Sequence, residues 1–145
     1  KSMFMGEFTC KVDNKGRMML PSKFRDELGE QEFVITRGLD NCIDLFPIEE
    51  WKNIEDKLKK LQTTNSKHRA YQRFVMSAAT KTEFDNQGRL NIPTSLMEHA
   101  QIDKKIIVTG MNDKIEIWSE ESWKKYIQNT GESIEDLVDE INFDF

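Results

Sequence analysis

The sequence predicts an α+β protein in which two β-hairpin and helix repeats, related by a pseudo-two-fold axis, interlock into a small barrel-like core flanked by helices. Three observations support this class: an internal repeat, the apolar alternation of short strands within each copy, and a helical apolar stripe after each copy. Each copy has about 50 residues and would bury too little apolar surface to be stable alone. We therefore expect the two copies to form one folded unit.

The internal repeat is marked by a turn sequence that occurs twice. Asp13–Arg17 recurs as Asp85–Arg89 at an offset of 72 residues, and an aliphatic residue and a proline follow each copy. Residues 8–58 align with residues 80–130 without a gap, and eleven of the 51 pairs are identical, where chance would give about three. The repeat divides the chain into a first unit at 7–58, a connecting helix at 59–79, a second unit at 80–130 and an acidic tail at 131–145.

The apolar pattern predicts the same order of elements in each repeat. The first repeat begins with an alternating strand in which Phe8, Cys10 and Val12 share one face. A tight turn and a short return strand follow, and Pro21 then opens a short helix. A second hairpin comes next, with strands predicted at 33–37 and 42–46 in the first repeat and at 105–109 and 114–118 in the second.

Apolar stripes at helical spacing predict a helix after each of these hairpins. Pro47 begins the first helix, and Ser119 is expected to cap the second. A further stripe lies between the repeats and contains Tyr71, Phe74, Val75 and Ala78. Trp51 and Trp123 occupy matching positions, so we expect them to pack in the core rather than to stack on bases.

The composition excludes several classes of protein. The chain has 145 residues and a net charge of −5, and it contains no apolar run near the ~20 residues that cross a bilayer. No secretory signal is recognisable, so we expect a cytoplasmic protein with no membrane partner. Removing the six acids of the tail changes the net charge from −5 to +1. Local basic clusters must therefore provide any affinity for nucleic acid.

The sequence contains no pattern typical of a catalytic or metal site. Cys10 and Cys42 are expected to stay reduced, because neither has a Cys or His at metal-ligand spacing. His68 and His99 lack such partners as well, and there is no phosphate-binding glycine loop or nucleophile elbow. The carboxylates fall on predicted helical faces and in the tail, where solvated charge is the ordinary outcome. The sequence therefore predicts a protein that is not an enzyme and has no cofactor and no metal.

The repeated Asp-x-x-Gly-Arg turn is the main candidate site. Aspartate accepts hydrogen bonds from its own turn and glycine supplies a positive φ, which gives structural roles to Asp13, Gly16, Asp85 and Gly88. Arg17 and Arg89 then emerge from a rigid hairpin, and a guanidinium suits phosphate oxygens or the O6 and N7 of guanine. In the alternative interpretation each turn is only structural, and its Asp and Arg pair with each other.

Two basic clusters accompany the turns. The first lies around the first turn and consists of Lys11, Lys15, Arg17, Lys23 and Arg25, with one acid among them. The second, at 51–73, has seven cations and two acids; it is typical of a solvated helical face, with DNA contact through charge as the alternative. From the two turns and the first cluster we predict the DNA-binding residues to be Lys15, Arg17, Lys23, Arg25 and Arg89.

Taken together, these residues resemble the MraZ family. The resemblance covers residues 3 to about 130 and rests on the opening Met5–Phe8, the first turn, the segment Leu20–Arg25, and the second turn with Ile92 and Pro93. It implies an AbrB-like, swapped-hairpin DNA-binding fold. It also implies a bacterial regulator that binds double-stranded DNA at short G-containing direct repeats in a promoter, typically that of its own operon of cell-division and cell-wall genes. A closed homo-oligomeric ring and a nucleoid location follow from the same resemblance.

Two features depart from the family pattern. The second turn carries Gln87 where the first carries Lys15, and the acidic tail lies outside the signature. We expect the first turn to dominate DNA affinity, because Lys15, Lys23 and Arg25 all belong to its repeat. Two other functions stay open at this point: an AbrB-like antitoxin-type binder, and a structural ring protein with no DNA role.

Overall fold

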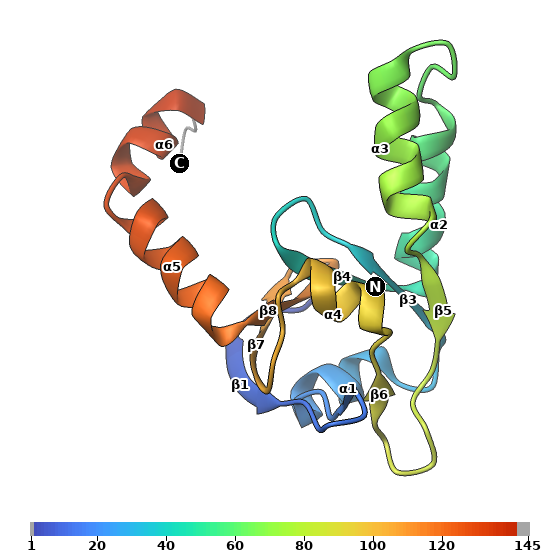
Figure 1. Ribbon diagram of the computed structural model, residues 1–145, viewed down its shortest axis with the longest axis vertical. Coiled ribbons are helices and arrows are strands. Elements are labelled where there is room, and N and C mark those ends of the chain that lie inside the picture. The colour runs from blue at the N-terminus through green and yellow to red at the C-terminus, as the bar shows by residue number, and fades with distance from the viewer. Residues whose placement is uncertain (1, 142–145) are drawn as a thin grey trace.

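The computed structural model describes residues 2–141, which form an α+β structure of two repeats, as the sequence predicts (Figure 1). The first repeat contains β1 (Glu7–Lys11), β2 (Arg17–Met18), α1 (Ser22–Leu28), β3 (Phe33–Arg37), β4 (Cys42–Pro47) and α2 (Ile48–Lys59). The helix α3 (Ser66–Met76) follows. The second repeat contains β5 (Thr80–Thr82), β6 (Leu90–Asn91), α4 (Thr94–His99), β7 (Lys105–Met111), β8 (Lys114–Ser119) and α5 (Glu120–Gly131), and α6 (Ile134–Ile141) ends the described chain.

The two repeats exchange strands within one antiparallel sheet. Its order is β1-β7-β8-β4-β3-β5, so β1 pairs with β7 of the second repeat, and β5 pairs with β3 of the first. At the centre β4 pairs with β8, with Asp44 opposite Glu116. These two residues are equivalent at the offset of 72, so the pseudo-two-fold axis passes between them.

A second, two-stranded sheet crosses the same axis. Here β2 pairs with β6, with Arg17 opposite Asn91 and Met18 opposite Leu90. Met18 and Leu90 are equivalent in the two repeats and are 2% and 0% exposed. We call residues 17–19 and 89–91 the ribbon, because each repeat supplies one of its two strands.

The principal core lies between one face of the large sheet and a layer formed by α1, α4 and the ribbon. Phe24 and Leu28 of α1, Leu96 of α4 and Ala100 at the C-cap of α4 are all at most 2% exposed. This confirms the short helical stripes predicted after the two prolines. The strands contribute alternate residues to the same cluster, among them Phe33, Ile35, Ile43, Leu45, Ile106, Val108, Ile115 and Ile117. Neither repeat encloses this core without the other.

Helices cover the opposite face of the sheet at its two ends. α2 and α3 form a hairpin whose buried residues pack with those of β3 and β4: Val34, Phe46, Trp51, Leu58 and Val75. At the other end, Trp118 of β8 contacts Trp123 and Tyr126 of α5, with ring centroids 5.3 and 5.0 Å apart. In Figure 1 the α2–α3 hairpin and the α5–α6 segment are two arms that project to one side, while the turn between β5 and β6 projects to the other.

The caps of these helices follow from local sequence. Ser119 caps α5 as predicted, and its hydroxyl accepts a hydrogen bond from the amide of Ser122 at 3.0 Å. Asn65 caps α3 by accepting from the amides of Lys67 and His68. The connecting segment, predicted as one helix over 59–79, is helical as α3 only at Ser66–Met76. The turn before Asn65 allows α3 to fold back onto α2.

The gapless alignment of the two repeats is wrong in one strand. In β3–β4 Phe33 lies opposite Pro47, whereas in β7–β8 Ile106 lies opposite Ser119. Since Pro47 and Ser119 are equivalent, Phe33 corresponds to Ile106 at an offset of 73. The second repeat has one additional residue before β7 and one fewer in the following turn. The apolar run in β7 is buried on both faces, so its sequence lacks the alternation that fixes a register.

α6 forms the middle of the predicted tail, and Asp144 lies outside the described residues. No helix in the described part of the chain has both the length and the apolar character to span a membrane. Cys10 and Cys42 are both free thiols.

Candidate nucleic-acid interface

The two Asp-x-x-Gly-Arg turns have the same internal geometry. Oδ1 of Asp13 accepts hydrogen bonds from the amides of Lys15 and Arg17, each at 2.9 Å. Oδ1 of Asp85 accepts from the two equivalent amides at 2.9 and 2.8 Å. The backbone amide of the arginine is the largest contribution that lowers the pKa of each aspartate, so both stay ionised at neutral pH.

Glycine is required at the fourth position of each turn. Gly16 and Gly88 have φ of 80° and 77°, in the left-handed region that L side chains rarely adopt. At Gly16 a Cβ would also lie 2.9 Å from the carbonyl oxygen of Ile92. The turn is therefore rigid in both repeats, and the strand that carries the arginine leaves it in a fixed direction.

Each aspartate also pairs with the arginine of its own turn. Nε of Arg17 donates to Oδ2 of Asp13 at 2.8 Å, and Nε of Arg89 donates to Oδ2 of Asp85 at 2.9 Å. This is the pairing that the structural alternative predicts. It uses only Nε, and within residues 2–141 no hydrogen bond engages the terminal nitrogens of either arginine. The side chains are 31% and 27% exposed. The pair therefore orients each guanidinium and leaves its outer edge available.

The ribbon places both arginines on one surface. Side chains alternate between the faces of a strand, so burial of Met18 and Leu90 turns their neighbours outward. The outward side chains are Arg17 and Met19 from β2 and its extension, and Arg89 and Asn91 from β6 and its extension. We call these four residues the ribbon face. Met19 and Asn91 are not among the residues predicted from the sequence, although each lies two residues after an arginine and therefore on the same strand face.

The neighbours of each turn come from the other repeat. A Cβ at Gly16 would lie 3.4 Å from Sδ of Met97 and 3.7 Å from Oδ1 of Asn91, both in the second repeat. A Cβ at Gly88 would lie 3.7 Å from Nη1 of Arg25 and from Cε of Met19, both in the first repeat. The exchange of strands therefore also exchanges the side chains around the turns.

This arrangement corrects the expected charge distribution. Arg25 of the first repeat lies beside the second turn, where its Nη1 would be 3.7 Å from a Cβ at Gly88, and its Nε donates to the carbonyl of Leu20 at 3.0 Å. Lys15 remains in the first turn and is exposed, and Lys23 is exposed at the start of α1. Lys15 thus adds a cation within the first turn, and Arg25 adds one beside the second. The sequence predicts that the first turn dominates DNA affinity partly because of Arg25, and the position of Arg25 beside the second turn removes that part of the reason.

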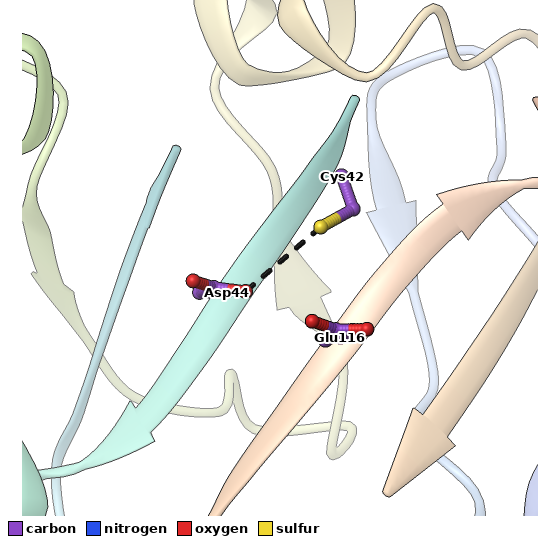
Figure 2. Close-up of side chains that lie close together, drawn as sticks. All are labelled: Cys42, Asp44 and Glu116. Atoms are coloured by element: carbon purple, nitrogen blue, oxygen red, sulfur yellow. Dashed lines mark hydrogen bonds between the residues drawn. The ribbon is translucent and has the colours of Figure 1, made fainter. Parts of the chain in front are cut away.

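A different group of charged residues lies at the centre of the opposite sheet face. Asp44 and Glu116 face each other across the β4–β8 pairing and are 7% and 8% exposed (Figure 2). Nζ of Lys114 lies 3.1 Å from Asp44 and 3.4 Å from Glu116. Nε1 of Trp118 donates to Glu116 at 3.1 Å. The expectation that carboxylates are solvated is wrong here, because both lie in the central β4–β8 pairing, where neighbouring side chains bury them.

Cys42 completes this central group, but it does not make a reactive or metal-binding site by itself. Its Sγ lies 3.9 Å from Oδ1 of Asp44, and Figure 2 shows the thiol and the two carboxylates converging from β4 and β8. Burial raises the pKa of the thiol, so it stays protonated and poorly nucleophilic. Burial likewise raises the pKa of Asp44, and the charge of Lys114 offsets part of that effect. The ammonium of Lys114 pairs with both carboxylates and offsets part of the charge that would otherwise attract a cation.

Comparison with known proteins agrees with this architecture. The family model for the MraZ protein, whose description also likens it to antitoxins, matches twice, at residues 3–74 and 75–141. A transcriptional regulator MraZ of Limosilactobacillus reuteri is 46% identical over 143 residues, covering 99% of this chain and 100% of that protein. Regulators of the same name from a Thermoanaerobacter species and from Thermoanaerobacter pseudethanolicus are 47% and 48% identical, each covering 97% of this chain and 97% and 99% of their own lengths. The two family matches correspond to the two interlocked repeats, and the chain belongs to the MraZ family of transcriptional regulators, which are not enzymes.

Proposed function

We propose that this chain is a sequence-specific DNA-binding transcriptional regulator that contacts double-stranded DNA through the ribbon face and the two flanking turns. The observation that supports the proposal is the pair of arginines, each oriented by its own aspartate through Nε and each with its outer edge free. A guanidinium held in this way loses little conformational entropy when it binds. The names of the relatives, all transcriptional regulators, agree with DNA as the partner.

The part of DNA that we propose for the ribbon face is the major groove. The major groove admits a two-stranded β-ribbon, and arginine donates to O6 and N7 of guanine there. We assign guanine contacts to Arg17 and Arg89. Lys15, Arg25 and Lys23 surround the same surface and would contact phosphates, whereas Asp13, Gly16, Asp85 and Gly88 hold the turns.

The resemblance to the family extends the proposal to the target and its place in the cell. We assign short direct repeats in a promoter as the DNA site, and the operon that encodes this regulator, with its cell-division and cell-wall genes, as the target. The protein would then act in the cytoplasm, at the nucleoid. Repeats spaced by one helical turn, ~10–10.5 bp, would present the same groove to successive subunits.

The same proposal includes a closed homo-oligomeric ring, which two complementary surfaces support. α6 exposes Ile134, Leu137 and Ile141 on one face, with fractions of 54%, 37% and 68%, and its other residues are mainly acidic. The α2–α3 hairpin is basic and has an apolar hollow lined by Leu58, Met76 and the stems of its neighbours. The two surfaces lie on different arms, so a contact between them joins copies head-to-tail, and such contacts form a closed ring when the rotation from one copy to the next closes.

Light scattering tests the assembly. Leu137→Asp places a charge on the apolar face of α6 and should reduce the mass in solution towards that of one chain, whereas Gln128→Ala on exposed α5 should not. A monomeric wild-type protein at micromolar concentration would contradict the ring.

A mobility-shift assay with the promoter of its own operon tests the DNA function. We expect the wild-type protein to retard this DNA at concentrations that leave a scrambled duplex free, and Arg17→Ala to lose most of that preference. No preference for the promoter would favour the structural ring without a DNA role. Co-purification of a stable protein encoded by the neighbouring gene would instead favour an antitoxin-type binder.

A further inference from the structure

The ribbon face is symmetric in its backbone but not in its side chains. Met19 and Asn91 are equivalent at the offset of 72, and both are exposed, Met19 by 45%. Each follows a pre-oriented arginine by two residues on the same strand face. The chain therefore presents Arg-x-Met from the first repeat and Arg-x-Asn from the second, in opposite directions along the ribbon.

The exchange of strands places each of these side chains beside the turn of the other repeat. Asn91 lies opposite Arg17 in the pairing of β2 with β6, and its Oδ1 points towards the first turn. Met19 points its Cε towards the second turn. One end of the ribbon face therefore combines an arginine with an amide, and the other combines an arginine with an apolar thioether.

The Asn91 amide is free to recognise a ligand. Within residues 2–141 it forms no side-chain hydrogen bond, although its neighbours Leu90 and Ile92 are buried and fix the backbone. Asparagine is suited to a bidentate contact with N6 and N7 of adenine, whereas an apolar side chain contacts the methyl group of thymine. The two ends of the face thus differ in the base that they can recognise.

We infer that Asn91 and Met19 are specificity-determining residues that give each subunit a direction on DNA. This inference rests on the proposed function of the ribbon face. Asn91 selects an adenine next to the guanine contacted by Arg17, and Met19 selects a thymine at the mirror position next to the guanine contacted by Arg89. A site of this kind is not its own inverted repeat. In an assembly whose subunits share one orientation along the DNA, each subunit must then bind its DNA site in the same direction.

Selection from a random DNA pool, followed by sequencing, tests the inference with the full-length protein. We expect the wild-type motif to be asymmetric about its centre. Asn91→Met should reduce the adenine preference about tenfold and raise thymine at that position. Met19→Asn should create an adenine preference at the mirror position and make the motif an inverted repeat. The conservative controls Asn91→Gln and Met19→Leu should keep part of each preference.

The outcomes separate this inference from the proposed function. Both positions are exposed, so circular dichroism and light scattering should show the wild-type fold and mass for every variant. Motifs that are identical in the wild type, Asn91→Met and Met19→Asn would overturn the inference while leaving the DNA function intact, provided that Arg17→Ala still reduces enrichment. A wild-type protein that enriches no motif would overturn the proposed function and this inference together.

Discussion

The pseudo-two-fold axis brings equivalent residues of the two repeats together in two regions, which differ in how charge is balanced. In the ribbon, Arg17 and Arg89 each have a counter-ion within their own turn. The same turn can therefore occur in both repeats without leaving an unbalanced charge. In the β4–β8 pairing, Asp44 and Glu116 face each other, so duplication brings like charges together in a buried place.

The sequence of the second repeat differs from that of the first in a way that reduces this repulsion. Lys114 occupies the position equivalent to Cys42 and contacts both carboxylates. Two cysteines at these positions would leave the carboxylates without a cation, and two lysines would replace the buried thiol with a second charge. A duplicated unit can therefore stay identical where its charges are balanced locally. It must diverge where equivalent charges meet on the axis.

The largest effect is expected from Lys114→Met. Removing the Lys114 ammonium leaves two buried carboxylates facing each other, and this should lower the free energy of unfolding by roughly 2 to 4 kcal/mol. Because the ammonium is partly exposed, the loss should lie near the lower part of the range for buried ion pairs. Denaturant unfolding measures the loss. Lys125→Met, which breaks an exposed pair on α5, should change stability little. Adding Glu116→Gln to Lys114→Met should restore part of the loss, and no restoration would contradict the like-charge explanation.

Arg17→Ala and Arg89→Ala compare the two turns directly. Because Lys15 lies in the first turn and Arg25 lies beside the second, we expect similar losses of about 1–3 kcal/mol per contacted site, with relaxed base preference. In an assembly, multivalency would multiply both losses. Fluorescence anisotropy on promoter and scrambled DNA measures them, with Lys52→Ala on α2 as the control. A much larger loss for Arg17→Ala would restore the dominance of the first turn that the sequence predicts.

Lys15→Ala and Arg25→Ala test the crosswise arrangement with smaller effects. Each should weaken binding to all sequences alike and reduce the salt slope by about 0.9 per lost phosphate contact. Arg25 lies beside Gly88, so a double-mutant cycle should couple Arg25 with Arg89 more strongly than with Arg17. Stronger coupling to Arg17 would mean that Arg25 acts within its own repeat.

The smallest effects concern pH, and the two regions should respond with opposite sign. The pKa values of Asp13 and Asp85 are lowered from 3.8, so their contribution to stability is present above that value and is lost as pH falls through the lowered pKa. The pKa of Asp44 is raised, so its contribution is fully present below 3.8 and is lost as pH rises through the raised pKa. Carboxyl NMR titration should show Asp44 titrating above the two turn aspartates, and the reverse order would contradict the assignment.

Much of the fold could be predicted from the sequence because its determinants are local. The alternation in β1, the prolines before α1 and α4, the helical stripe around Trp51 and the cap at Ser119 each act within a few residues. The Asp-x-x-Gly-Arg turn is equally local, since its hydrogen bonds join residues at most four apart. Both the structural residues and the arginines of the candidate site could therefore be predicted from their spacing in the sequence alone.

The sequence by itself determined that this protein has two copies of one unit, where each turn lies, and which arginine each aspartate holds. Only the tertiary structure decided which repeat surrounds which turn, that Arg25 lies by Gly88, that Asn91 and Met19 share the ribbon face, and that Asp44 meets Glu116. The physical reason is the exchange of strands between repeats. Pairing β1 with β7 and β2 with β6 depends on burying a shared core that neither repeat can enclose alone, and no short-range pattern in the sequence records that choice.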